Sequence, residues 1–304
     1  MLIAHVERTG VWLDEGGMHR LAAVLAELAI ARGASFHYGA RAQRVLVRSG
    51  RVAEVQLASG DKIAADAVVV NADVAAVAGG RLGEAIAGAV PTMPRSARSL
   101  SAVTWALVAA TEGFPLIRHN VFFSQDYAAE FEDLFGRAIL PSAPTVYLCA
   151  QDRDGADAAL PTGPERLLCL VNAPATGDRH PFSSADIASC GHRTFATLKR
   201  CGLSVDRKPE TTVVRTPADF ERRFPATGGS LYGTASHGWL ASFRRPGART
   251  RLPGLYLAGG STHPGAGVPM AALSGRLAAT SLLEDLASTS RSRRTAMSGG
   301  MSMP

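Results

Sequence analysis

The sequence has little of what marks a membrane-spanning or exported chain. Charged residues make up 19% of its 304 positions and aromatic residues 6%. No apolar run approaches the ~20 residues that a helix needs to span a bilayer. The opening MLIAHVERTG has no apolar stretch behind basic residues, so a signal peptide is not predicted. Any contact with a membrane is therefore expected to be peripheral.

Cysteine is scarce, and no metal-binding or nucleophilic spacing is present. The four cysteines, Cys149, Cys169, Cys190 and Cys201, form no CxxC pair. This argues against disulfides and against a zinc site, and it fits a reducing compartment. The sequence also has no Ser-His-Asp order, no paired carboxylates placed for acid–base work and no metal cluster. We therefore predict no metal and no protein nucleophile in the chemistry.

Basic charge is in excess but is not gathered into a patch. The formal net charge is +6, and 29 of the 32 basic residues are arginine. The arginines are scattered, except for a dense group at Arg291, Arg293 and Arg294 near the end of the chain. Because zinc-finger spacing, an RNA-binding signature and a recognition helix are all missing, nucleic-acid binding is not predicted.

The apolar pattern of the first part predicts one helix and then a sheet. Residues 16–32 carry leucine and valine at helical spacing, and 35–39 alternate like a short strand. Two turn signals divide 43–73 into strand-like runs, which predicts a β-meander. The meander leads into the apolar run 68–70, which is typical of a strand buried in a parallel sheet.

The middle of the chain, 79–235, differs and is expected to be a second, α+β domain inserted into the first. Strand-like runs occupy 101–110, 120–124, 145–151, 166–172 and 211–216, with helical stretches at 185–201 and 217–224. The end returns to the style of the first part. A strand over 252–260 leads through a glycine-rich loop into a helix over about 269–286, and 287–304 is expected to be a disordered tail.

The segment GLYLAGGSTHPGAGVPMAALSGRLAA, 254–279, is the most informative stretch. Gly259 and Gly260 would let a ligand approach the backbone, and Gly265 and Gly267 permit positive φ in the loop. Pro269 suits a first helical position, where no N–H is needed. The helix N-terminus would then stabilise an anion or an electron-rich ring. The plain alternative, a glycine-rich connection without a ligand, is disfavoured by the density of glycines between a strand and a helix.

At this segment the chain resembles the bacterial carotenoid desaturases, the phytoene desaturase family within the flavin amine-oxidase group. The run Thr262-His263-Pro264-Gly265-Ala266-Gly267 is the most specific piece. The following VPM and AALSGRLAA resemble the hydroxyneurosporene and methoxyneurosporene desaturase branch, as does the stretch 145–175. The helix at 10–29 resembles the family's Gly-Gly helix, and 64–73 resembles its adenine-side sheet.

The resemblance implies FAD as the cofactor and an α/β fold. A Rossmann-like FAD-binding domain, made of 1–78 and 236–286, would carry 79–235 as an inserted substrate-binding domain. The cofactor-binding residues implied are Val45, Asn71, Gly259, Gly260, Ser261, Gly265, Gly267, Val268, Pro269 and Met270. Many relatives have an acid after the strand to hold a ribityl hydroxyl, and here Gly260 leaves that role to backbone groups or to Ser261. No catalytic residue is assigned.

The family's dinucleotide fingerprint, GxGxxG, does not occur in the sequence. The nearest candidate, Gly265-Ala266-Gly267, has Met270 where the last glycine would stand. In the family this fingerprint precedes the Gly-Gly helix, so the domain is expected to lack its N-terminal βαβ unit. We therefore expect a truncated chain, an upstream in-frame segment that encodes the fingerprint, and no retention of FAD by residues 1–304 alone.

The resemblance implies desaturation of a carotenoid, at the 3,4 bond of a 1-hydroxy- or 1-methoxy-carotenoid. The alternatives are a phytoene desaturase, a carotenoid isomerase and, in another class, a non-catalytic fragment. Because the substrate dissolves in lipid, we expect a peripheral protein on the cytoplasmic side of a membrane. The electron acceptor and the oligomeric state are not assigned.

Five single residues were considered, and four of them keep two interpretations. His263 could assist proton transfer or fix the turn by a hydrogen bond, which is favoured. His237 is interpreted as a loop residue. Trp105, Trp239 and Phe243 could line a polyene channel, although such aromatics more often belong to a core.

Overall fold

The computed structural model describes residues 8, 10, 12, 16–153, 161–235 and 244–296, with side chains up to 288. The chain divides into two compact units, Met1–Arg41 and Ala42–Pro304, which are described separately.

The first unit contains helix α2 (Met18–Ile30), which confirms the helix predicted over 16–32. None of its side chains is buried, although leucine and valine recur at helical spacing along it. The strand predicted over 35–39 is wrong, because this stretch forms a turn in which Phe36 stacks on Tyr38 at a centroid distance of 5.9 Å. Alternation alone does not make a strand, since a strand also needs a partner for its backbone groups.

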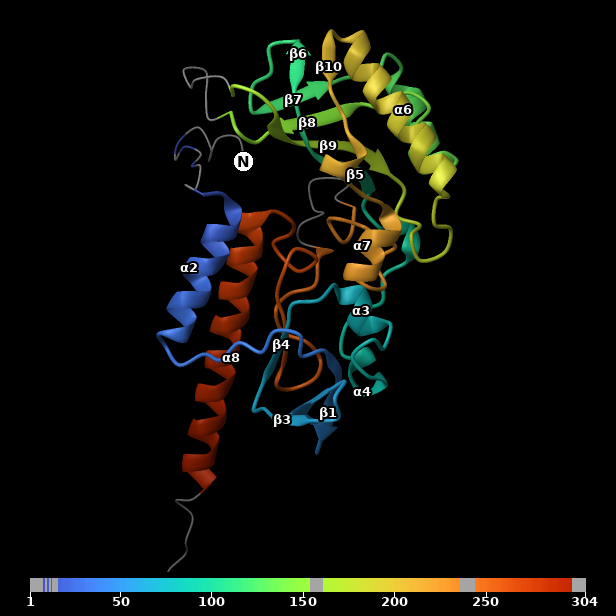
Figure 1. The fold of residues 1–304 in the computed structure, drawn as a ribbon. Coiled ribbons are helices and arrows are strands. Elements are labelled where there is room, and N and C mark those ends of the chain that lie inside the picture. The colour runs from blue at the N-terminus through green and yellow to red at the C-terminus, as the bar shows by residue number, and fades with distance from the viewer. Residues whose placement is uncertain are drawn as a thin grey trace, which may run out of the picture. The chain divides into compact units, whose positions relative to one another are not determined.

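The second unit begins with the predicted meander. Strands β1 (Ala42–Arg48), β2 (Arg51–Leu57) and β3 (Lys62–Ala64) pair antiparallel in chain order (Figure 1). The β1–β2 turn is made by Ser49 and Gly50, with φ of 49° and 72°. Positive φ at both turn positions matches the twist of the two strands, which is why the sequence signal was reliable here.

Strands β4 (Val68–Val70) and β12 (Leu255–Leu257) form a parallel pair from distant parts of the chain. This confirms the prediction of parallel pairing for 68–70. The prediction of full burial is wrong in part, because Val69 is 43% exposed. Among the described strands the two pair only with each other, so part of each remains open. The short helices α3 (Val74–Ala78) and α4 (Glu84–Ala87) follow β4.

A five-stranded antiparallel sheet dominates the middle of the chain (Figure 1), with strand order β11-β5-β9-β8-β7. Its strands are β5 (Ser101–Ala109), β7 (His119–Phe122), β8 (Val146–Ala150), β9 (Glu165–Ala173) and β11 (Thr212–Arg215). All five were predicted, because each is a run of apolar, β-branched and aromatic residues between turn signals. Smaller elements complete this part: β6 (Thr111–Gly113), β10 (Leu203–Val205), α5 (Tyr127–Phe131), η1 (Arg95–Ala97), η2 (Glu132–Gly136) and η3 (Pro209–Thr211).

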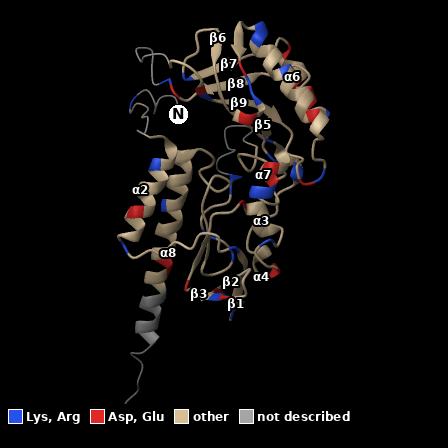
Figure 2. Cartoon of the chain, in the orientation of Figure 1, with Lys and Arg blue, Asp and Glu red and all other residues tan. Residues whose placement is uncertain are grey.

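Two predicted helices flank this sheet region with complete start signals. Helix α6 (Ser184–Arg200) begins at a capping box of Ser183 and Asp186, and α7 (Pro217–Arg223) begins at one of Thr216 and Asp219. Each has an acid in its first turn and arginine or lysine in its last, which favours the helix dipole. Both signs of charge are accordingly mixed on each helix (Figure 2).

The side chains bury two separate cores. One core joins the meander, β4 and β12 to residues that include Ile86 and Val90. The other joins the five-stranded sheet to α6 and contains Trp105, which is 2% exposed and meets Phe195 edge to face. Trp105 is thus a core residue, as favoured. Ile86 and Val90 fall in the first core although the inserted domain was expected to start at 79, and the domain division itself stays a prediction.

Helix α8 runs over Val268–Ala296. Its start agrees with the prediction, but its end lies ten residues beyond the expected 286. Residues 287–296, assigned to a disordered tail, therefore continue the helix. Residues 287–296 are mostly polar and have no apolar stripe, so their sequence gave no sign of a helix packed against the protein. The backbone is nevertheless helical as far as Ala296. Residues 297–304 lie outside the described part of the chain.

Candidate functional site

The glycine-rich turn starts where β12 ends beside β4. The Ala258 N–H donates to the Val70 carbonyl at 3.0 Å, which extends the parallel pairing by one residue. Gly259 then adopts φ of 118°, and a Cβ at this position would meet the Asn71 carboxamide oxygen. The structure thus brings together two of the predicted cofactor residues, Asn71 and Gly259. Glycine is needed here for both backbone angle and space.

Ser261 ties the turn to the first helix after β4. Its hydroxyl oxygen accepts from the Val74 N–H at 3.3 Å. Asp73 caps the same helix by accepting from the Ala75 N–H at 2.8 Å. Ser261 keeps its own O–H to donate to a ligand, so the predicted contact with a ribityl hydroxyl is compatible with this geometry.

The second half of the turn leads into α8 as predicted. Gly265 and Gly267 have φ of 138° and 109°, which only glycine adopts without strain. The first bond of the helix runs from the Ala271 N–H to the Gly267 carbonyl at 2.8 Å. Gly267, Val268 and Pro269 are exposed, so the N–H groups of the first turn face solvent rather than packed protein. The cleft expected in front of them stays a prediction.

Helix α8 also closes back on the start of the turn. The Gly259 N–H donates to the hydroxyl of Ser274, which has no exposed surface, at 3.2 Å. Strand end, turn and helix therefore form one hydrogen-bonded unit. Met270 is half-buried on the same helix.

Arg245 holds this unit from the side and was missed by sequence reasoning. It is 7% exposed, and its Nη1 donates to the carbonyls of Tyr232 at 2.9 Å and Gly260 at 3.0 Å. Its Nη2 donates to the Thr234 carbonyl at 2.9 Å. Burial lowers the pKa of the guanidinium, and the charge of Asp73 opposes that shift. The run Arg244-Arg245-Pro246 gives no sign of which arginine is buried.

Thr262 and His263 lie in the middle of the turn. Thr262 is fully buried, and its hydroxyl oxygen has no hydrogen-bond partner among the described residues. The backbone N–H of His263 donates to the Pro246 carbonyl at 2.8 Å, and a cis peptide bond joins it to Pro264. Whether its imidazole fixes the turn or moves a proton stays a prediction.

Val45 lies apart from the glycine-rich turn. Its side chain is 3% exposed within the first core, and its N–H donates to the Leu82 carbonyl at 2.9 Å. Only its backbone could therefore face a cofactor. His237, Trp239 and Phe243 lie outside the described residues, so their predicted roles are not addressed.

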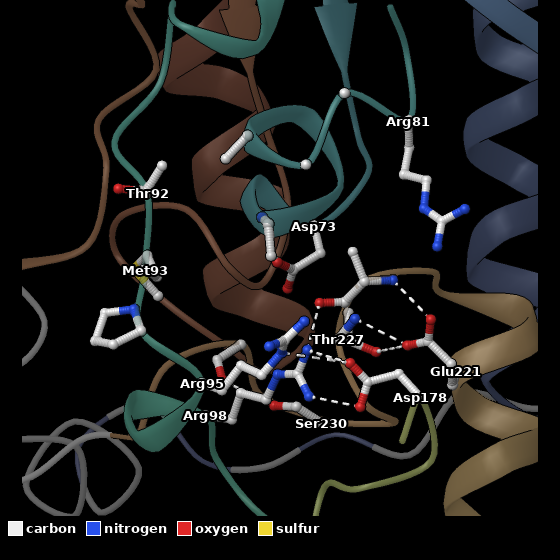
Figure 3. Close-up of a pocket in the computed structure, with 17 residues that line it drawn as sticks. Asp73, Arg81, Thr92, Met93, Arg95, Arg98, Asp178, Glu221, Thr227 and Ser230 are labelled. Carbon is white, nitrogen blue, oxygen red and sulfur yellow. Dashed lines mark hydrogen bonds and ion pairs between the residues drawn. The ribbon is translucent and has the colours of Figure 1, made fainter. Parts of the chain in front are cut away.

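A cavity of about 680 Å³ lies next to this unit (Figure 3). None of the predicted cofactor residues lines it, but Asp73 and Gly233 do. Gly233 connects the cavity to the turn, because a Cβ there would lie 2.8 Å from the Ser261 Cβ. Sequence analysis did not identify this cavity, since its walls come from short helices and loops in separate parts of the chain.

Two of the acids that line the cavity, Asp178 and Glu221, are already engaged. Arg98 binds both carboxylate oxygens of Asp178 at 2.9 Å, which lowers the pKa of that acid (Figure 3). Glu221 accepts from the N–H groups of Ala226, Thr227 and Gly228. The cavity walls are thus stabilised internally.

Within the described residues, no His, Cys, Asp or Glu cluster could hold a metal ion. None of the described helices combines the length and apolar character of a membrane span. The four cysteines are free thiols, of which Cys201 alone is exposed.

The chain matches the model of a known protein family over residues 2–283, and that family is described as flavin containing amine oxidoreductase. The chain belongs to this family. As a member of the flavin-containing amine oxidoreductases, it is expected to work with a flavin, and FAD is the cofactor that the family supports.

Similar proteins and one solved structure agree with this membership. The chain is 56% identical to a hydroxyneurosporene desaturase of Rubrivivax gelatinosus, over 99% of this chain and 57% of that protein. It is 49% identical to a hydroxyneurosporene desaturase of Cereibacter sphaeroides, over 95% of this chain and 57% of that protein. An oxidoreductase structure from Methanosarcina mazei matches 89% of this chain and 55% of its own, with a TM-score of 0.51 and 18% identity, which supports the fold. The chain thus spans little more than half the length of the proteins it matches.

The turn fits one part of a flavin. It combines positive φ at Gly259, Gly265 and Gly267, an exposed helix N-terminus and a buried hydroxyl at Thr262 without a partner among the described residues. Backbone donors and the positive end of α8 suit an electron-rich ring or its polar edge. The residues present are therefore compatible with FAD at this turn.

Proposed function

We propose that the chain functions in the FAD-dependent desaturation of a carotenoid, at the 3,4 bond of a 1-hydroxy- or 1-methoxy-carotenoid. The observation that carries the proposal is the β12–turn–α8 unit in a chain that is 56% identical, over 99% of its length, to a hydroxyneurosporene desaturase. The unit supplies the kind of surface that a flavin requires, and the similarity supplies the class of substrate.

The turn would hold the cofactor largely through its backbone. The residues proposed to contact FAD are Asn71, Gly259, Gly260, Ser261, Gly265, Gly267, Val268, Pro269 and Met270, with Val45 acting through its backbone. When bound, the flavin would accept the hydrogen removed from the substrate, so the protein needs no nucleophile of its own. The chain's own residues would position both molecules and exclude water.

The five-stranded sheet offers a surface for the polyene. One of its faces packs on α6. The opposite face carries polar residues at Thr104, Arg166 and Asn172 and, between them, the apolar residues Ala106, Val108, Leu168, Leu170 and Val213. Val108 and Val213 are 44% and 49% exposed, so part of this apolar face is open. A long apolar chain could lie across these strands, and we propose that the substrate does so.

A polar pair interrupts the same sheet face. His119 Nδ1 and the Tyr147 hydroxyl lie 2.8 Å apart on neighbouring strands. Burial, followed by the influence of Cys149, raises the pKa of Tyr147 to about 12. The phenol therefore stays protonated at physiological pH.

The proposed carotenoid substrate is apolar apart from its hydroxyl or methoxyl group. For this reason we also propose that the protein works at a membrane surface.

Product analysis tests the activity. The gene that contains this chain would be expressed in cells that accumulate 1-hydroxy- or 1-methoxy-carotenoids, and the pigments separated by chromatography. One additional double bond in the expected position supports the proposal. An unchanged number of double bonds with altered geometry would indicate an isomerase, and conversion of phytoene alone would indicate a phytoene desaturase. Unchanged pigments at normal protein levels would indicate a non-catalytic chain.

A further inference from the structure

The helical segment made of α5 and η2 has its polarity reversed. Glu130 and Asp133 point inward and are each 2% exposed. Tyr127, Phe131 and Phe135 point outward and are 52%, 43% and 52% exposed. A helix on the solvent-exposed surface of a globular protein normally has the opposite arrangement, with its apolar residues facing the core and its acids facing water. The outer face of this segment is therefore suited to an apolar environment.

The two acids are held inside by specific hydrogen bonds. Glu130 accepts from the Thr145 N–H at 3.0 Å, just before β8. Asp133 accepts from the N–H and the hydroxyl of Ser142 at 2.9 and 2.8 Å, which lowers its pKa. The acids thus attach the segment to the loop that precedes β8. Because Tyr127, Phe131 and Phe135 are spaced four residues apart, they share one side of the segment, and this side is left on the outside.

The three rings form one continuous surface, which we call the aromatic row. Tyr127 and Phe131 meet edge to face at a centroid distance of 4.8 Å, and Phe131 stacks on Phe135 at 5.8 Å. Beyond its two ends lie Phe123, 68% exposed, and Ile139, 43% exposed. Each ring is fixed by its neighbour, so the row keeps its shape in the free protein.

We propose that the aromatic row docks the protein on a phospholipid surface. Tyrosine and phenylalanine suit the boundary between headgroups and acyl chains. Arg137 follows the row with its side chain 64% exposed. Its Nη1 pairs with Asp133 at 3.3 Å, and the exposed remainder of the guanidinium can complement an anionic headgroup. Two acids also lie on this segment: Asp126 caps α5 by accepting from the Ala129 N–H, and the Glu132 carboxylate lies beside Gly136.

The size of the row favours lipid over a second copy of the chain. Fully buried aromatic side chains contribute about 150–250 Å² each, so three half-exposed rings offer roughly 300 Å². A stable dimer needs about 800 Å² from each partner. Insertion into lipid has no such threshold, since each ring adds its own contribution. The choice of lipid rests in part on the proposed function, because an apolar carotenoid would be drawn from a bilayer.

Vesicle binding of the purified chain tests this surface without any substrate. The variant Phe131→Ser with Phe135→Ser should bind vesicles of phosphatidylglycerol and phosphatidylcholine at least about tenfold more weakly than the unmodified chain. The matched control is Phe224→Ser, since Phe224 is 59% exposed but lies outside the row. It should bind as the unmodified chain does. Circular dichroism checks that all three proteins are folded.

Single tryptophan substitutions keep the test valid if the double variant does not fold. Relative to the unmodified chain, whose three tryptophans give the background emission, Phe131→Trp should show an added blue shift with vesicles and added quenching by brominated lipids, whereas Phe224→Trp should add neither. Equal binding by the double variant, or no binding by the unmodified chain, would overturn the proposal. So would a dimer that the double variant converts to monomer while vesicle binding stays unchanged, because the row would then join two copies.

These outcomes are independent of the enzymatic proposal. Vesicle binding through the row without any desaturated carotenoid would support the docking surface and contradict the proposed activity. Desaturated carotenoid without an effect of the row on vesicle binding would support the activity and contradict the docking surface.

Discussion

The guanidinium of Arg245 donates to the carbonyl of Gly260 at 3.0 Å and so fixes the backbone of the glycine-rich turn. The same side chain lies under Gly265, where a Cβ would be 3.3 Å from its Nε. One buried arginine therefore contacts both halves of the turn. A glycine-rich loop has high backbone freedom, and a rigid, planar donor from outside reduces it.

Replacing Arg245 should loosen the turn. Arg245→Met leaves the carbonyls of Tyr232, Thr234 and Gly260 without this donor, and we expect the free energy of unfolding to fall by about 2–4 kcal/mol. Arg245→Lys should recover only part of the loss, because an ammonium group cannot span three carbonyls in the same geometry. Urea denaturation of the three proteins measures this. Full recovery by lysine would mean that charge alone, not the planar donor set, holds the turn.

Two adjacent glycines should respond differently to alanine. Gly259 has φ of 118° and packs on Asn71, so Gly259→Ala should lower the free energy of unfolding by about 1–3 kcal/mol. At Gly260 the nearest atom to a new Cβ is 3.6 Å away, an ordinary contact, so Gly260→Ala is the control and should cost less than about 0.5 kcal/mol. Thermal unfolding measures both, and equal losses would contradict the assigned backbone geometry.

The sheet domain should lose stability in acid through Glu165. This residue is 2% exposed and is bound by Arg153 at 2.7 and 2.9 Å, which lowers its pKa. Its contribution is fully present above its unfolded pKa of about 4.3 and is lost as the pH falls through the lower folded value. Glu165→Gln should cost about 3 kcal/mol at pH 7 and flatten this acid dependence.

Denaturation curves between pH 3 and pH 7 check that prediction. The control is Asp152→Asn, because Asp152 pairs with Arg166, whose side chain is 67% exposed. That pair should be worth less than about 1 kcal/mol. If both variants cost the same at pH 7, burial would not be what makes the Glu165 pair important.

Thiol labelling should distinguish one cysteine from the others. Cys201 is exposed at the end of α6, whereas Cys149, Cys169 and Cys190 are buried. Burial raises the pKa of Cys169 to about 12, so this residue stays protonated at pH 8, and the protonated thiol is unreactive. We expect one thiol per chain to react rapidly with a disulfide reagent at pH 8, and none after Cys201→Ser. Rapid reaction of two or more thiols in the folded protein would contradict the core packing of the sheet.

The local elements and the glycine-rich turn could be predicted from the order of residues alone. The meander, the five strands of the large sheet, α6 and α7 were predicted because their signals are short-range: apolar periodicity and turn or boundary residues. The start of α8 followed from Pro269 after Gly265 and Gly267. Resemblance in the same segment indicated the flavin family, which the family match confirms.

The contacts between distant residues, by contrast, became visible only in the folded chain. Asn71 packs on Gly259 because β4 and β12 pair in parallel, and Arg245 reaches Gly260 because the chain folds back between them. Neither contact leaves a periodic trace in the sequence. The outward position of Phe131 was equally hidden, since it depends on hydrogen bonds that hold Glu130 and Asp133 inside. Local signals arise from each residue's own backbone and neighbours, whereas these contacts depend on how separate segments pack together.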